Sequence, residues 1–495
     1  MVWFKNLIFY DLFLLTIFIL FVVVFLYKRR KKLDREGWLY IYRTSLGLKI
    51  IDKIGGKYKK TLKFFSYVSV ILGYILMVTG LYLIFQTAYY YIKFPGITDV
   101  IKAPPVFPIF PYFPKVFGLS SFFPELYFIY FIIAIAIVAV VHEFSHGIFA
   151  RFYKVKIKST GFAFLGPILG AFVEQDDKDM LKKKPFEQKA ILGAGVLANL
   201  IVMFLFYFVM IFVFVNFFIP SGAVFNGYPA GTVSTNVIQG IENYPVIDMT
   251  NEEIIDLIKN KNIQDDKIGN YNLTEIKIQN KSFYAPIKNL ELAYNYSGNL
   301  VVFYDSPALK SGFPDVKAWE KAAIVEFNGV KINNYQNLVN ELRKYSPGDK
   351  VSVKTKYNGQ TEDYEVILGE HPLNKTVSFL GINNDYAQEK RGMRKIISFF
   401  TFYKDDSTFY EPVNSNILVI FIYNFIWWIV ILNLAVALFN MLPLGILDGG
   451  RFFYLTILEL SGSEKNARRM FKAITYIIMT LFLVLLIVWG VSFFR

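Results

Sequence analysis

The sequence predicts a polytopic α-helical membrane protein with one α+β domain outside the cytoplasm, and three observations carry this prediction. The 495-residue chain is 54% hydrophobic and 18% aromatic but only 19% charged, whereas about 25% charged residues are usual in soluble proteins. Six apolar runs are each long enough to cross a bilayer, which requires roughly 17–25 residues. One long polar stretch, residues 221–410, separates the fourth run from the fifth.

The apolar runs predict about six transmembrane helices. They cover residues 7–27, 64–92, 122–150, 190–218, 414–443 and 471–493. The first run is not a cleaved signal peptide, because it is too long and its positive cluster follows it. A shorter apolar segment, 159–175, contains three glycines and a proline, which disfavour a helix. We interpret it as a re-entrant β-hairpin; the alternative is a loop lying on the bilayer surface.

The distribution of charge predicts the orientation in the membrane. The net charge is +14; residues 28–63 hold 13 basic and 3 acidic side chains, whereas residues 221–410 hold 21 and 23. Basic loops between apolar runs indicate the cytoplasmic side, so residues 28–63, 151–158 and 444–470 are expected inside and 221–410 outside. This pattern indicates contact with membrane lipid and no nucleic-acid partner. The sequence carries no signal for an oligomeric partner.

These features divide the chain into four segments. They are 1–95, two transmembrane helices with a basic cytoplasmic loop; 96–220, the first part of the helical core; 221–410, the extracytoplasmic domain; and 411–495, the second part of the core. The extracytoplasmic domain has a faint internal repeat, with copies at 228–258 and 306–342 that each pair a short strand with an amphipathic helix. Asn358-Gly359 between two alternating segments predicts a β-hairpin.

The sequence His142-Glu143-Phe144-Ser145-His146 carries the clearest chemical signal. Residues four apart share one helix face, so both imidazoles can bind one zinc ion while Glu143 points to its water. The alternative is a pair of buried structural histidines, but ionisable groups inside a membrane are functional by default because their burial is costly. The chain has no cysteine, which excludes thiolate ligands and a cysteine nucleophile.

A catalytic zinc keeps three protein ligands and one open position. The remaining histidine, His371, lies in the extracytoplasmic stretch and is interpreted as a loop residue. The best candidate for the third ligand is Asp448, which follows the fifth span at the inner face, where the histidine motif also ends. The alternative is that Asp448 caps the next helix, and the two roles can coexist.

Two asparagines near the same depth are further candidates. Asn199 ends a run of small residues in the fourth span, and such residues let helices approach closely. Its amide could donate to an oxyanion in the transition state or make an interhelical hydrogen bond. The same two interpretations apply to Asn440.

Four motifs together resemble the site-2 protease family of intramembrane zinc metalloproteases. They are HEFSH at 142–146, GAFVEQDD at 170–177, the small-residue motif ending at Asn199, and N-x-x-P-x-x-x-x-D-G beginning at Asn440. The extracytoplasmic repeat resembles the PDZ modules inserted in many family members. The resemblance implies zinc bound by His142, His146 and Asp448, Glu143 as general base, and Asn199 and Asn440 beside the scissile carbonyl. It also implies that segment 159–173 holds the unwound substrate as an added strand.

The resulting expectation is a zinc metalloendopeptidase that hydrolyses peptide bonds within transmembrane helices of proteins already cut on their outer side. The PDZ-like domain would filter substrates. One alternative is a non-catalytic membrane scaffold or chaperone with a structural zinc, which would be distinguished by loss of Glu143 or a ligand. Another is a metal transporter, which would need more intramembrane carboxylates and histidines along a path.

Overall fold

The computed structural model describes residues 2–94, 104–120, 122–166, 168–279, 281–316, 320–371, 374–384 and 400–492. The chain forms two compact units. The helical unit comprises Met1–Phe214 and Leu418–Arg495, and the inserted unit comprises Val215–Ile417. The helical unit is therefore built from two stretches of sequence that the inserted unit separates.

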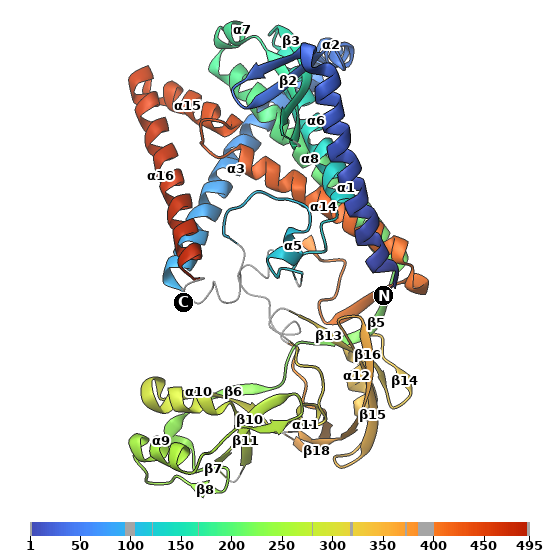
Figure 1. Ribbon diagram of the computed structural model, residues 1–495, viewed down its shortest axis with the longest axis vertical. Coiled ribbons are helices and arrows are strands. Elements are labelled where there is room, and N and C mark those ends of the chain that lie inside the picture. The colour runs from blue at the N-terminus through green and yellow to red at the C-terminus, as the bar shows by residue number, and fades with distance from the viewer. Residues whose placement is uncertain are drawn as a thin grey trace. The chain divides into compact units, whose positions relative to one another are not determined.

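Among the described residues, six helices of the helical unit are long and apolar enough to cross a membrane, which confirms the predicted number (Figure 1). They are α1 (Val2–Arg29), α3 (Lys59–Lys93), α6 (Phe128–Phe152), α8 (Pro185–Phe217), α14 (Ile417–Asn440) and α16 (Glu464–Ser492). In their most apolar windows, α1 and α16 each bury 11% of residues and α14 buries 39%. The first and last helices therefore present most of their surface outward, while α14 lies within the bundle.

A four-stranded antiparallel sheet in the helical unit joins two hairpins from distant parts of the sequence. The first hairpin consists of β1 (Leu33–Glu36) and β2 (Leu39–Thr44), and the second of β3 (Ile157–Leu165) and β4 (Ile168–Gln175). The strand order is β1-β2-β3-β4, so β2 pairs with β3 and β4 lies at one edge. The segment interpreted as a re-entrant hairpin supplies β3 and β4.

The basic segment after the first helix, expected to be a cytoplasmic loop, is instead folded. After the first hairpin it forms α2 (Leu48–Lys57), which packs on α6. A Cβ on Gly55 would lie 2.8 Å from the carbonyl oxygen of Ile148, so the two helix backbones touch there. Ile51 is fully buried and meets Gly147 of α6. This packing gives the segment a buried apolar face, which accounts for its order.

Small residues also bring α8 against α3. A Cβ on Gly193 would lie 2.6 Å from the carbonyl oxygen of Ser69, and the Ser69 hydroxyl donates to the carbonyl oxygen of Ala190 at 3.2 Å. Without a hydrophobic driving force between helices in lipid, such close packing and interhelical hydrogen bonds hold a bundle together.

The start of α6 is capped by a side chain from another helix. Asp11 of α1 is only 4% exposed. It accepts hydrogen bonds from the backbone N–H of Phe128 at 2.6 Å and of Ile129 at 2.9 Å, and from the Tyr112 hydroxyl. The first N–H groups of a helix have no partner within it, and the local N-cap residue, Tyr127, supplies none through its side chain. Helix α1 thereby fixes the end of α6.

The inserted unit contains two β modules, and its buried apolar side chains form two clusters. The first has seven strands in the order β6-β12-β11-β10-β7-β8, with β9 paired to β10; the second has six in the order β16-β15-β13-β5-β19, with β14 paired to β13, and a separate pair β17-β18. The elements are β5 (Phe218–Phe225), β6 (Ala230–Ser234), β7 (Gly240–Ile241), β8 (Tyr244–Pro245), α9 (Asn251–Asn260), β9 (Asp266–Ile268), β10 (Tyr271–Ile278), β11 (Lys281–Ala285), α10 (Ile287–Leu292), β12 (Asn299–Tyr304), α11 (Pro307–Lys310), β13 (Ala322–Phe327), β14 (Val330–Lys331), α12 (Tyr335–Leu342), β15 (Lys350–Tyr357), β16 (Gln360–Ile367), β17 (Gly369–His371), β18 (Asn374–Phe379) and β19 (Thr408–Pro412).

The predicted hairpin of the inserted unit is confirmed. Strands β15 and β16 pair along their length, with Tyr357 opposite Gln360. Asn358 and Gly359 have φ of 50° and 77°. Positive φ at both central residues is the type I′ turn, whose twist matches that of the strands and which Asn-Gly adopts at little cost.

Replacing Asp11 with alanine is expected to destabilise the helical unit by about 1–2 kcal/mol, because two N–H groups of α6 lose their acceptor. The measurement is thermal unfolding of the full chain in detergent. Glu464→Ala is the control, since it removes an exposed carboxylate that pairs with Arg468 on the same helix, and such pairs contribute about 0–0.5 kcal/mol. Equal unfolding temperatures for the two variants would contradict the capping role.

Candidate metal centre

The two histidines of the HEFSH motif lie one turn apart on α6 and face the bundle interior. Each is only 6% exposed. The rest of the helix is almost entirely apolar until Arg151, so the motif is a polar patch on an apolar helix. Their Nε2 atoms are 3.0 Å apart, with the rings nearly perpendicular at 80°. The spacing of four residues accounts for this approach, since one turn of helix brings i and i+4 together.

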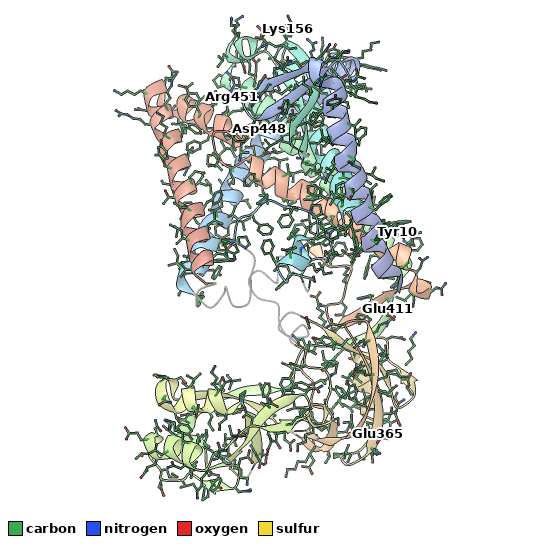
Figure 2. All side chains as sticks on the ribbon, viewed as in Figure 1. Tyr10, Lys156, Glu365, Glu411, Asp448 and Arg451 are labelled. Atoms are coloured by element: carbon green, nitrogen blue, oxygen red, sulfur yellow. The ribbon has the colours of Figure 1, made fainter. Side chains whose placement is uncertain are left out.

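Asp448 begins the short helix α15 (Asp448–Ser461), which follows the turn after α14 (Figure 2). Gly449 and Gly450 let this turn close tightly: a Cβ on Gly449 would lie 2.3 Å from the carbonyl oxygen of Met441, and one on Gly450 would lie 2.1 Å from that of Leu444. The N-cap position of α15 is Leu447, and no side chain caps the helix there. The interpretation of Asp448 as a helix cap is therefore wrong, because its carboxylate faces the histidines instead.

Three ligand atoms converge at one point. Oδ2 of Asp448 lies 3.1 Å from Nε2 of His142 and 3.2 Å from Nε2 of His146. With the distance of 3.0 Å between the two nitrogens, these atoms form a nearly equilateral triangle. Ligands about 2.0 Å from a tetrahedral zinc are about 3.3 Å apart, so the observed spacing fits one face of such a site. The donor set of two imidazoles and one carboxylate also fits zinc, with a fourth position left open.

Helix α8 holds the far nitrogen of each imidazole. Nδ1 of His146 lies 2.7 Å from the carbonyl oxygen of Ile191, an acceptor that requires a proton on Nδ1. Nδ1 of His142 lies 3.2 Å from the side-chain amide of Asn199. Asn199 is fully buried and its Oδ1 has no hydrogen-bond partner as placed. Since amide oxygen and nitrogen are assigned by their hydrogen bonds, exchanging the two gives Oδ1 a partner in Nδ1–H and leaves Nε2 free for a metal.

The histidines pack directly on Gly195 of α8. A Cβ at this position would lie 2.5 Å from Nε2 of His146 and 2.6 Å from Cε1 of His142. Only glycine leaves room for both rings, so the small-residue motif of the fourth span serves the metal site as well as helix packing.

The other two predicted residues, Glu143 and Asn440, make different contacts. The carboxylate of Glu143 accepts a hydrogen bond from the backbone N–H of Val173 in β4 at 3.0 Å. The amide of Asn440, at the end of α14, lies 3.5 Å from Nε2 of His142, the nitrogen that faces the metal position. Asn199 contacts the opposite nitrogen of the same ring. The structure thus places the two asparagines on different sides of His142.

The electrostatics of Asp448 favour its ionised form. Burial raises the pKa of the carboxyl, but the positive charge that the imidazoles of His146 and His142 carry when protonated outweighs this effect and holds the pKa below its usual range. An ionised carboxylate is the form that binds a metal. His371 lies outside this group; the prediction that it is a loop residue is wrong, since it ends strand β17 of the inserted unit and pairs with Asn374. Among the described residues, His142, His146 and Asp448 make up a group whose ligand atoms all lie within 4.8 Å of one another.

Sequence reasoning missed three residues at this site: Val173, Ile191 and Gly195. Val173 and Ile191 act through backbone atoms, for which the side-chain type gives no signal. Gly195 was noted as a small residue for helix packing, and its contact with the imidazoles depends on the register of α8 against α6.

This site has the composition of a metallopeptidase centre carried on membrane helices. Residues 130–486 match Peptidase family M50, the site-2 protease family, and the chain belongs to this family of zinc metalloproteases. A 192-residue stretch is 34% identical to an uncharacterized protein of Methanocaldococcus jannaschii, covering 38% of this chain and 48% of that protein. The chain thus spans about half the length of the curated relative it matches.

Gly195→Ala is expected to weaken zinc binding by about 10–100-fold or more, because the added methyl displaces both imidazoles. The measurement is competition with a chromogenic zinc chelator in detergent. Gly490→Ala on α16 is the matched control, since a Cβ there meets nothing within 4 Å. Unchanged zinc affinity in Gly195→Ala would mean that the histidines do not bind zinc in this arrangement.

Asn199→Leu tests which role this residue has. If it orients His142, zinc affinity falls by about 10–100-fold, as for other groups that hold a ligand in place. If it acts only on the transition state, zinc affinity is unchanged and kcat alone falls. Asn440→Leu serves for comparison, since Asn440 lies near the metal-facing nitrogen. We expect the zinc affinity of the Asn199 variant to fall below that of the Asn440 variant, and the reverse order would contradict this assignment.

Proposed function

We propose that this protein is a zinc-dependent endopeptidase that hydrolyses peptide bonds within transmembrane helices of other proteins. The observation that carries the proposal is the convergence of Nε2 of His142, Nε2 of His146 and Oδ2 of Asp448, with Glu143 on the same helix. When bound, zinc supplies Lewis acidity, which acidifies water and polarises a carbonyl group. His142, His146 and Asp448 would hold it.

The protein side chains would then transfer one proton from water to the leaving amine. The Glu143 carboxylate accepts a proton from the attacking water and delivers it to the nitrogen of the leaving amine, as a general base and then a general acid. Asn440 would donate its amide N–H to the carbonyl oxygen under attack, where negative charge develops. The bond that breaks is the peptide C–N bond, and water supplies the atoms that complete both products.

Strand β4 is the proposed support for the substrate. A transmembrane helix satisfies its own backbone hydrogen bonds, so it must unwind before it can be cut. β4 lies at the edge of its sheet and packs against α6. An unwound segment can replace its helical hydrogen bonds by pairing with this edge. We further propose that the β3–β4 hairpin enters the membrane, where irregular backbone is tolerated if it is buried in protein.

The inserted unit is the proposed substrate filter. Its two β modules, which we interpret as PDZ-like, would lie outside the cytoplasm by the distribution of basic loops. They would exclude proteins with large outer domains, so that substrates arrive after a first cut on that side. The active site would lie near the cytoplasmic face, from which water enters. A non-catalytic scaffold or chaperone with a structural zinc is the alternative, and the presence of Glu143 in the motif together with all three ligand residues disfavours it.

The test is cleavage of a model transmembrane helix by the purified full chain in lipid vesicles. Wild type is expected to cut, while Glu143→Gln and wild type with a zinc chelator show no detectable cutting, because loss of a general base lowers the rate by about 10²–10⁴-fold and loss of the metal removes the Lewis acid. Glu341→Gln, on α12 of the inserted unit, is the matched control and keeps activity. Cutting by all samples would indicate a contaminating protease. Absence of cutting by zinc-loaded wild type across a panel of transmembrane helices would favour the scaffold alternative.

A further inference from the structure

The backbone of β4 touches the proposed general base. The N–H of Val173 donates to Oε2 of Glu143 at 3.0 Å. Because N–H groups alternate in direction along a strand, the N–H of the preceding residue, Phe172, points the other way, toward its partner Gly161 in β3. The bond to Glu143 is therefore made by the outer edge of the sheet, and a shift of β4 would move or release the carboxylate.

The side chain of Val173 also holds β4 in this position, because it packs into the interior of the helical unit. It is 8% exposed and packs against Gly147 of α6 and Ile51 of α2. The segment that leads into α2 also meets the motif itself, since a Cβ on Gly47 would lie 2.3 Å from the ring of Phe144, the residue after Glu143. The segment after α1 thus contacts both β4, which binds the Glu143 carboxylate, and α6, the helix that carries Glu143.

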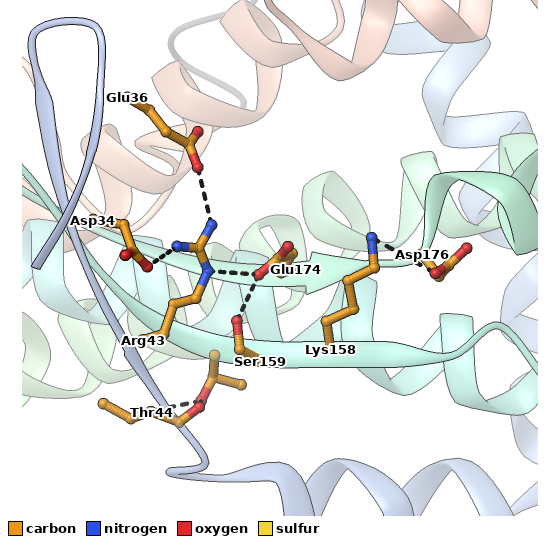
Figure 3. Close-up of polar contacts among 9 residues, drawn as sticks. Asp34, Glu36, Arg43, Thr44, Lys158, Ser159, Glu174 and Asp176 are labelled. Atoms are coloured by element: carbon orange, nitrogen blue, oxygen red, sulfur yellow. Dashed lines mark hydrogen bonds and ion pairs between the residues drawn. The ribbon is translucent and has the colours of Figure 1, made fainter. Parts of the chain in front are cut away.

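The next residue of β4, Glu174, is tied to the first hairpin (Figure 3). Its carboxylate accepts from Nε of Arg43 in β2 at 2.9 Å and from the hydroxyl of Ser159 in β3 at 2.7 Å. These two donors lower the pKa of Glu174, with Ser159 the larger cause. As an edge strand, β4 has one neighbour in the sheet, β3, and the Arg43 contact reaches across that neighbour to β2.

Arg43 is the centre of a cluster with three carboxylates. Besides Glu174, it binds Glu36 at 2.9 Å and also Asp34, both of β1 (Figure 3). The guanidinium offers donors in a fixed planar fork and can serve three acceptors at once. Without it, three negative charges would face one another across the sheet, and their repulsion would separate the hairpin from β4. Arg43 therefore joins β1, β2 and β4 into one body.

This hairpin lies before residue 130, where the match to the family begins. We propose that Arg43 is a positioning residue for the general base: it fixes β4 through Glu174, so that the adjacent Val173 N–H meets Glu143. The assignment of Glu143 as base rests on the proposed function, while the positioning itself is a property of the fold. The β1–β2 hairpin, which lies outside the matched segment, would thus hold the edge strand β4 in the position from which it binds Glu143.

The first measurement is hydrogen exchange of the Val173 amide in the full chain in detergent. In Arg43→Gln we expect exchange at Val173 to rise at least ten-fold, toward the rate seen in Glu143→Ala, where the acceptor is absent. The Phe172 amide is the internal reference and stays protected, since it bonds to β3. Glu174→Gln is a second variant that breaks only the link to β4 and leaves Arg43 with Asp34 and Glu36, should Arg43→Gln unfold the hairpin.

The second measurement is the kinetics of cleavage of the model helix. In Arg43→Gln and Glu174→Gln, kcat is expected to fall about ten-fold with KM and zinc affinity unchanged, because misplacing a catalytic group by about 1 Å has effects up to a hundred-fold. The double variant should be no worse than Arg43→Gln alone, since both act through one contact. Lys158→Gln is the matched control: it removes an ion pair with Asp176 of 3.6 Å and a weak charge attraction to Glu174, but leaves the hydrogen bonds of Glu174 with Arg43 and Ser159 in place (Figure 3).

Faster Val173 exchange in both variants, with Lys158→Gln like wild type, supports the proposal. Unchanged exchange at Val173 in both variants overturns it, and so does a rise in KM at constant kcat, which would assign the hairpin to substrate binding. If zinc-loaded wild type cuts no substrate, the proposed function fails, and the exchange result still decides whether Arg43 positions Glu143.

Discussion

The helical unit depends on bringing two imidazole nitrogens and one carboxylate oxygen within about 3 Å of one another in apolar surroundings. Such a cluster is costly in the absence of a metal or shared protons, because three electron-rich atoms face one point. Close packing around the cluster holds these three atoms together despite this cost in free energy. Gly195 leaves room for both rings, and Gly449 and Gly450 let the chain turn tightly enough to bring Asp448 to them. The arrangement of α6, α8 and α14 is thus set by the site as much as by lipid.

The sequence was sufficient for features that depend on local spacing. The six spans follow from length and hydropathy, the pair of histidines from a separation of four, and the β15–β16 hairpin from Asn358-Gly359. Asp448 was predicted by topology, because two motifs ending at the same face had to meet. Its alternative role as a helix cap was wrong for a local reason: Leu447 takes the cap position, so the carboxylate is free to turn inward.

Features that depend on pairing between distant segments were not predicted. The first hairpin was treated as a basic loop, because its short alternation in 39–44 is masked by the surrounding charges. Its pairing joins residues more than a hundred positions apart, and Arg43 reaches Glu174 across 131 positions. The side of His142 on which Asn199 lies depends on the rotation of α8 about its axis, which hydropathy does not determine when a helix is apolar nearly all round.

The cap that Asp11 provides for α6 has a consequence for biogenesis. Helix α1 is synthesised before α6, so its carboxylate is already in the membrane when the amides of Phe128 and Ile129 arrive. The donors of the incoming helix therefore meet a waiting acceptor rather than hydrocarbon, and the order of the helices in the chain matches the order in which their hydrogen bonds can form. Placing α1 later in the gene would leave α6 without this acceptor during insertion.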